Sequence, residues 1–150
     1  MILNQVAANL DFIASVVHTL NVNCKMFKIT NANKREFSLD IKCSKPTIGE
    51  DAKFGKLLMQ INVSVMQENA DLEPDTFELV LEGIFSSPAS LSDDEFMGLL
   101  NVNGGAALYS IARAKLEAIS SLIYAEGKIL LPMVNIIQYY QERNTSHEEH

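Results

Sequence analysis

Few side chains of this chain are of the kinds that do chemistry, and the sequence does not bring them together. His18 has the parity of the inward residues on the first predicted strand, which favours a structural, hydrogen-bonded histidine over a catalytic one. Cys24 and Cys43 fall on different predicted strands with no convergent histidine, so they do not form a zinc site. Catalysis requires titratable or nucleophilic groups that converge in a pocket. The sequence therefore predicts a protein that is not an enzyme.

Two other features match ligand-binding motifs only in part. Gly104-Gly105 lacks the lysine and the preceding strand that a phosphate-binding nucleotide loop requires. His147 and His150 flank two glutamates in a polar tail, which is a weak metal motif. The two cysteines occupy inward strand positions, which favours reduced, core-filling thiols over a disulfide. We therefore expect no cofactor and no metal site.

Charge is distributed unevenly along the 150 residues, whose formal net charge is −7. The span between Lys56 and Arg113 contains no lysine or arginine and carries nine carboxylates. Binding to nucleic acid depends on basic groups that neutralise phosphates, so this span predicts no nucleic-acid partner. The acidic span either keeps the protein soluble or provides a docking face for a basic partner.

Length and segment hydropathy indicate one domain, 1–150, with a cytoplasmic address. A chain of this length is large enough for a hydrophobic core of its own. The first seventeen residues contain no basic group, so we expect no secretory signal. No apolar run approaches the roughly 20 residues that a bilayer-spanning helix needs, so we expect no membrane insertion.

The elements that would position a site are predicted from four stretches in which apolar and polar residues alternate. A period of two puts each apolar set on one face of a strand, so one face of an antiparallel sheet is buried. Two helical segments follow, which favours an α+β fold: a four-stranded antiparallel sheet, then a long helix and a short C-terminal helix, in two layers. The apolar sets are Leu20-Val22-Cys24-Met26, Phe37-Leu39-Ile41-Cys43, Leu57-Met59-Ile61-Val63-Val65 and Phe77-Leu79-Leu81.

Turn residues and strand length set the expected bounds of these strands. The first strand is predicted from about Ser15 to Phe27, after a lead-in over 1–12. Because that is long for a strand, we expect a bend or bulge near Asn21 or Asn23. The second strand is predicted to end at Lys45-Pro46, with a loop over 46–51 and a third strand from about Gly55 to Gln67.

Capping signals place the helices. Ser92-Asp93-Asp94-Glu95 forms a capping box that starts a short helix, and Asn103-Gly104-Gly105 is expected to interrupt it. A longer amphipathic helix is predicted over 106–126, with Gly127 at its C-cap. A second capping box, Asn135 to Gln138, is expected to start the final helix.

The segment after the long helix carries more apolar residues than one core would use. Residues 129–134 are almost wholly apolar, and the apolar residues of the last helix point in several directions. Part of this area is expected to be covered by another subunit or left for a partner, which favours oligomerisation over a tightly packed two-layer core. Residues 143–150 are polar and are expected to form a flexible tail.

From about Ile13 to Gln141 the chain resembles the SecB family of bacterial preprotein chaperones. The resemblance rests on short runs in the same order and spacing behind four strands. In the family these runs read Gly-Ile-Phe-Ser, Pro-Tyr-Ala-Arg-Glu and Pro-Val-Asn-Phe. Here the corresponding residues are Gly83-Ile84-Phe85-Ser86, Tyr109-Ser110-Ile111-Ala112-Arg113, Gly127 and Pro132-Met133-Val134-Asn135.

This resemblance implies a tetramer built as a dimer of dimers, and an ATP-independent holdase that binds unfolded polypeptides on hydrophobic grooves. Family clients are preproteins kept competent for export and delivered to the SecA motor, which docks on an acidic sheet face. We assign that docking face to Glu78 and Glu82. The groove is assigned to Met26, Phe27, Ile129, Leu130, Leu131, Met133, Ile137 and Tyr140, and the oligomer interface to Tyr109, Ala112, Leu116 and Ile119.

Three departures from the family pattern keep alternatives open. Ala114 follows Arg113 where the family has glutamate, Ile129-Leu130-Leu131-Pro132 replaces an aromatic-proline run, and the chain contains no tryptophan. One alternative is a SecB-like chaperone dedicated to a single client such as an antitoxin. The other is an adaptor that binds one folded partner through its acidic sheet face.

Overall fold

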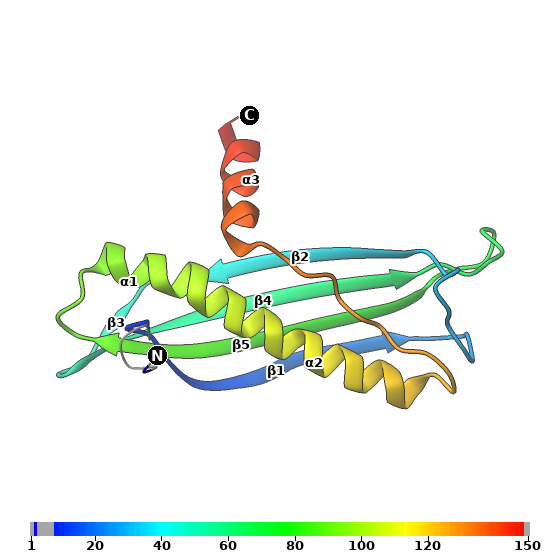
Figure 1. Ribbon diagram of the computed structural model, residues 1–150, viewed down its shortest axis with the longest axis horizontal. Helices are drawn as coiled ribbons and strands as arrows, with labels where there is room; N and C mark the ends of the chain where they lie inside the picture. Colours follow the sequence, from blue (N-terminus) through cyan, green and yellow to red (C-terminus); the bar gives the residue numbers. More distant parts are fainter. Residues whose placement is uncertain (1, 3–7, 149–150) are drawn as a thin grey trace.

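A curved antiparallel sheet with a long helix laid diagonally across one face forms the body of the protein (Figure 1). The computed structural model describes residues 2 and 8–148. The strands lie in the order β1-β5-β4-β2, with the short β3 also paired to β4. This confirms the predicted α+β fold. The elements are β1 (Asp11–Asn23), β2 (Arg35–Cys43), β3 (Thr47–Ile48), β4 (Ala52–Val65), β5 (Asp75–Pro88), α1 (Asp93–Leu99), η2 (Leu100–Gly104), α2 (Gly105–Ile123) and α3 (Ile136–Glu148).

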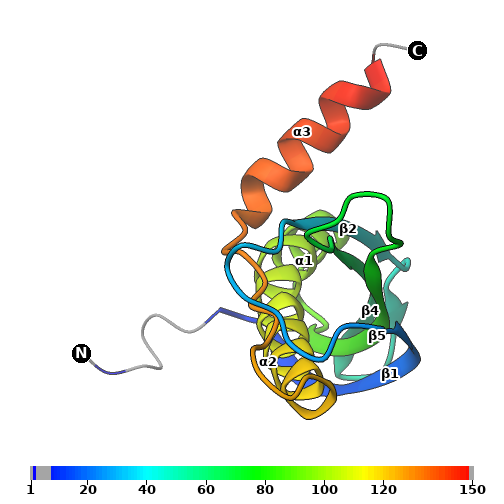
Figure 2. The same ribbon diagram turned by 90° about the vertical axis from the view of Figure 1, so that its right-hand side faces the viewer.

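The core lies between the inner face of the two central strands and the helices. Alternate residues of β4 and β5 are buried along almost their whole length, because these strands have neighbours on both sides and helices above them. The helices contribute Phe96, Leu100, Leu108 and Leu116, all fully buried. The segment 124–135 returns beside α2 on the same face of the sheet (Figures 1 and 2).

Strand β1 differs from its predicted form. It begins at Asp11 and ends at Asn23, and its two register shifts lie between Phe12 and Ala14 and between Val17 and Thr19 rather than near Asn21 or Asn23. The second shift inverts the side-chain parity on one side of it. His18, predicted to face inward, is therefore half exposed on the outer face.

The segment after β2 also departs from expectation. Residues 46–51 contain the two-residue strand β3, which pairs with Phe54 and Lys53 of β4. Strand β4 consequently begins at Ala52, earlier than predicted, and it ends at Val65. These changes lengthen the sheet edge without altering which residues of β4 face the core.

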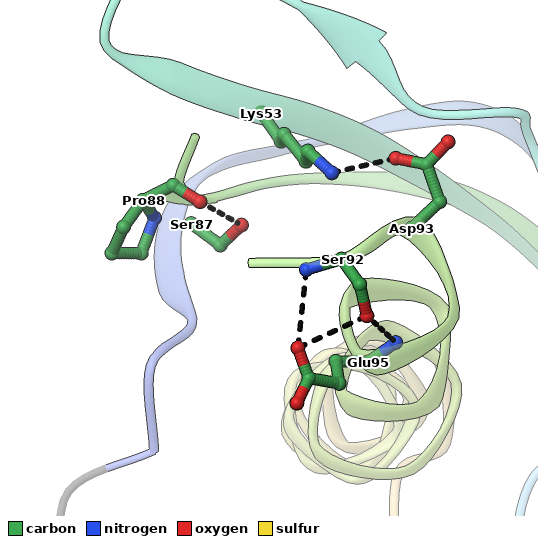
Figure 3. A network of polar contacts seen from close by, with 6 residues as sticks. All are labelled: Lys53, Ser87, Pro88, Ser92, Asp93 and Glu95. Carbon is green, nitrogen blue, oxygen red and sulfur yellow. Dashed lines mark hydrogen bonds and ion pairs between the residues drawn. The ribbon is translucent and has the colours of Figure 1, made fainter. Parts of the chain in front are cut away.

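The start of α1 confirms the first capping box. The Ser92 hydroxyl accepts a hydrogen bond from the Glu95 backbone N–H at 3.2 Å, and the Glu95 carboxylate accepts one from the Ser92 N–H at 3.1 Å. These bonds hold the pKa of Glu95 below its ordinary value. Lys53, buried on β4, donates to Asp93 at 2.6 Å and fixes the helix to the sheet (Figure 3).

The predicted break at Asn103-Gly104-Gly105 does not occur. The chain passes from α1 through one π-helical turn, η2, directly into α2. The two glycines serve close packing instead, because a β-carbon on Gly104 would lie 3.2 Å from Leu57, and one on Gly105 would lie 3.3 Å from Ile136.

Gly127 is not the C-cap of α2, which ends at Ile123 with Tyr124 as its cap. The residue has a φ of 90°, and a β-carbon there would lie 2.3 Å from the carbonyl oxygen of Ile29. Its place is in the return segment, beside the bridge between Lys28 and Glu126. Glycine is required both for the left-handed backbone and for the close approach of the two segments.

We expect Gly127→Ala to lower the free energy of unfolding by about 2–3 kcal/mol, since it adds left-handed strain to a backbone clash. Urea denaturation followed by circular dichroism measures the change. Gly98→Ala is the matched control, because a β-carbon there meets nothing within 4 Å. In a helix that substitution should raise stability by about 0.5–1 kcal/mol. Equal effects of the two substitutions would contradict this account of Gly127.

Helix α3 stands away from the sheet (Figures 1 and 2). The second capping box is half formed: the Asn135 side chain accepts from the Gln138 N–H at 3.2 Å, but the Gln138 side chain donates to Glu142. The helix continues to Glu148, past residue 143, where the flexible tail is predicted to begin. None of the described helices is long and apolar enough to cross a membrane.

Candidate functional site

The residues predicted to form a client groove fall into two classes. Ile129 and Leu131 are buried in the core, although both were predicted to line the groove. Burial alternates along this extended segment from Ile129 to Pro132, which exposes Leu130, and Met133 after it is also exposed. Phe27 and Ile137 are also exposed, whereas Met26 and Tyr140 are half-buried.

These residues do not line one continuous groove. Leu130 lies in a depression beside Arg113 and Glu117 of α2. Met26 lines a second depression with Asn33 and Leu72, at the far end of the sheet. Tyr140 lines a third, between α3, η2 and the end of β2. The apolar surface exposed by the chain is therefore divided among several places.

The edge of β2 that faces away from β4 carries backbone groups that could bind another chain. Strand β2 pairs with β4 on one side only. Beyond that pairing, the Ile41 N–H donates to the Tyr139 hydroxyl at 3.0 Å, and the Ile41 carbonyl accepts from Arg143, both from α3. Ile41 therefore turns its backbone away from β4.

The residues two and four before Ile41 share this orientation, because N–H and C=O groups of an antiparallel strand alternate between its two sides. Leu39 and Phe37 thus present their backbone groups at the open edge. Within the described residues, no hydrogen bond engages these groups on that side. The Phe37 side chain, predicted as core, is 38% exposed beside the edge. Sequence reasoning missed this site because strand order decides which strand is an edge.

The acidic residues do not form one face. Glu78 and Glu82 lie on the outer face of β5 as predicted, opposite Asn62 and Leu58 of β4. The Glu82 carboxylate lies 3.6 Å from both the His18 Nε2 and the Lys56 Nζ, so its charge is locally compensated. The other carboxylates of the acidic span lie at the 66–75 connection and at the start of α1.

Three of the four residues predicted for the oligomer interface are buried within the monomer. Tyr109, Ala112 and Leu116 are buried beneath α2 within the monomer, and the Tyr109 hydroxyl donates to the Pro132 carbonyl at 2.6 Å. Only Ile119 is partly exposed. The amphipathic stripe of the helix is used by the chain's own sheet, because that sheet needs a cover.

Exposed apolar side chains gather instead on β1, the other edge strand. They alternate poorly around the two bulges, so both faces of the strand are apolar. Each of four large side chains there is between 46% and 50% exposed: Phe12, Ile13, Val16 and Leu20.

A buried polar network joins the ends of three elements. Asp75, fully buried at the start of β5, accepts from the N–H groups of Lys25 and Met26 at 2.8 and 3.3 Å and from the Tyr124 hydroxyl at 2.9 Å. Burial, together with these neighbours, raises the pKa of Tyr124, and burial likewise raises the pKa of the Cys24 thiol. The Tyr124 hydroxyl and the Cys24 thiol therefore stay protonated at neutral pH, which indicates a structural role for the network.

No cluster of three metal-type side chains occurs among the described residues. His150 lies outside them, so the weak tail motif has no structural description. Both cysteines are free, partly buried thiols: Cys43 is the last residue of β2, and Cys24 follows the end of β1.

The solved structures that are similar to this chain include two of low sequence identity. The first is the SecB-like chaperone Rv1957 of Mycobacterium tuberculosis, in complex with a ChAD peptide from the HigA1 antitoxin Rv1956. Its TM-score is 0.58 at 11% identity, over 87% of this chain and 94% of that one. The second is a protein of unknown function from Streptococcus agalactiae, with a TM-score of 0.51 at 12% identity, over 85% and 100%. No protein-family model and no curated relative matches the sequence. The fold is therefore SecB-like.

Proposed function

We propose that this protein is an ATP-independent holdase chaperone, without enzymatic activity, that binds extended segments of unfolded polypeptides at the edge of β2. The observation that carries the proposal is the open backbone of Leu39 and Phe37 beside an exposed aromatic ring. An extended chain can add to such an edge as a further strand, through main-chain hydrogen bonds that are independent of sequence. Support comes from the SecB-like neighbour, which binds a peptide.

The nature of the client is a further part of this proposal. The first candidate client is the class of preproteins, which a general holdase in the cytoplasm would keep competent for export and pass to SecA. A single dedicated client is the second candidate, favoured by the antitoxin peptide bound to the structural neighbour. The adaptor alternative has less support, because the acidic residues are divided among three places and Glu82 is already paired.

Self-association is also proposed, through β1 rather than α2. Among the described strands, none pairs with the outer edge of β1, and a long, apolar edge strand is a template for pairing with a second chain. Strand β1 has 13 residues, of which only Asp11 and His18 are ionisable. Pairing between copies would cover its apolar side chains and place more than one client site on each particle, so that binding gains from avidity.

The Leu39→Pro variant tests the client site. Proline removes the one backbone N–H that points to the open edge at this position, and it leaves the ladder to β4 intact. We expect about a tenfold loss of affinity for an unfolded chain, from the lost donor and the blocked approach of a strand. Fluorescence anisotropy with labelled, reduced and carboxymethylated α-lactalbumin measures the affinity.

The native form of the same probe serves as the folded control, and it should not bind. Ile48→Asp is the matched protein control, since it adds a charge at an exposed apolar residue of β3. It should leave the affinity unchanged. Full affinity in a folded Leu39→Pro protein would rule out strand addition at β2, and absence of binding by the wild type would rule out the holdase.

A further inference from the structure

Helix α3 uses the backbone groups that would continue the open edge of β2. The Tyr139 hydroxyl accepts a hydrogen bond from the Ile41 N–H, and Arg143 donates one to the Ile41 carbonyl. Both backbone groups of Ile41 at the open edge are therefore hydrogen-bonded to side chains of α3. The Arg143 Nη1 also lies 3.6 Å from Asp40. A polypeptide strand that paired with Phe37 and Leu39 would meet α3 at the next edge position.

The packing of α3 against the body is otherwise slight. Ile136 is buried at its first position, and among the following residues up to 146 only Tyr139, Tyr140 and Arg143 are partly buried. All three line the side of the helix that faces β2, and the rest of the helix projects away from the sheet (Figure 2). An open depression of about 530 Å³ separates α3 from η2 and the end of β2, lined by Cys43, Asn101 and Asn144 among others. Few contacts would be lost if α3 moved.

The Tyr140 hydroxyl opposes this position of α3. This hydroxyl is buried, and no described residue forms a hydrogen bond with it. Burial raises the pKa of Tyr140 to about 12, so the hydroxyl remains an unused donor at neutral pH. Leaving a buried polar group unpaired opposes this arrangement, and movement of α3 would return the hydroxyl to water.

We propose that the client edge of β2 extends to Ile41 and Cys43, and that α3 is a strap that covers this part until an extended polypeptide displaces it. The proposal rests on the proposed function, because the displacing strand is the client. Binding then exchanges the two side-chain bonds at Ile41 for main-chain bonds. Clients long enough to reach past Leu39 compete with α3, whereas shorter ones do not.

The strap predicts opposite changes in client affinity for substitutions at two adjacent residues of α3. Tyr139→Phe removes the acceptor of the Ile41 N–H and weakens the strap, so affinity for a long unfolded chain should rise about fivefold. Tyr140→Phe removes a hydroxyl that has no partner, which stabilises the strapped state, so affinity should fall about fivefold. A general loss of stability cannot shift the two variants in opposite directions.

A reversible cross-link gives a second readout. Cys43 and Asn144 line the same depression from β2 and α3. In a Cys24→Ser background, Asn144→Cys would be joined to Cys43 by a bismaleimide that contains a reducible disulfide. Locking α3 should reduce binding of the long chain at least tenfold, and reduction should restore it. The uncross-linked double variant is the control.

The outcomes separate this inference from the proposed function. If the wild type binds no unfolded chain, the holdase proposal fails and the strap fails with it. If the wild type binds but both phenylalanine variants shift the affinity in the same direction, or neither shifts it, only the strap is wrong. Wild-type affinity of the cross-linked protein for the long chain would also overturn the strap.

Discussion

Replacing Asp75 with alanine is expected to lower the free energy of unfolding by about 3–4 kcal/mol, the largest effect of any single substitution proposed for this protein. The carboxylate accepts three hydrogen bonds in a fully buried position, from two backbone N–H groups and from Tyr124. Alanine leaves all three donors without a partner. Two of these donors lie just after β1 and the third caps α2. Their loss of a partner should therefore weaken the packing of both ends against the start of β5.

Urea denaturation at neutral pH measures this change, with two controls. Tyr124→Phe removes one of the three bonds and should cost about 1.5 kcal/mol. Glu73→Ala removes a carboxylate that pairs with Lys25 at 3.2 Å, but both side chains are well exposed. That substitution should change stability by less than about 0.5 kcal/mol. A cost below about 1 kcal/mol for Asp75→Ala would contradict the structural role of the network.

The central strands could be predicted from the sequence because their surroundings are symmetrical. Strands β4 and β5 have a neighbour on each side, so every second residue is buried and the alternation is complete. Strand β1 is an edge with two bulges, and a bulge leaves no mark in the hydrophobic pattern. The expected inward position of His18 failed for this reason. The capping box at Ser92 was predictable because it depends on four adjacent residues.

Much less of the candidate site could be predicted. The sequence predicts surplus apolar surface near residue 130, but the predicted groove includes both the exposed Leu130 and the buried Leu131. The apolar stripe of α2 predicts a contact with another subunit, but Ala112 and Leu116 in that stripe are buried within the monomer. The open edge of β2 depends on strand order, and the hydrogen bond from Ile41 to Tyr139 joins residues far apart in the sequence. Neither property is visible in local patterns.

The second large effect is expected at β1. Combining Val16→Lys with Leu20→Lys places a charge on each face of the exposed edge strand, where two copies are proposed to pair. Lysine on an edge is a common means of preventing strand pairing, since its charge would have to be buried. We expect self-association to weaken at least a hundredfold, which is about 2.7 kcal/mol. Sedimentation velocity over a range of protein concentrations measures the effect.

Ile48→Lys is the matched control, because it adds the same charge at an exposed apolar residue of β3 and should leave the particle mass unchanged. The monomeric double variant should still bind a short unfolded peptide with the wild-type dissociation constant, because β2 lies at the opposite edge of the sheet. It should bind a long chain more weakly, because two sites on one particle no longer act together. An unchanged mass for the double variant would place the subunit contact elsewhere. A wild type that stays monomeric would remove avidity from the mechanism and leave strand addition at β2 as the whole source of client affinity.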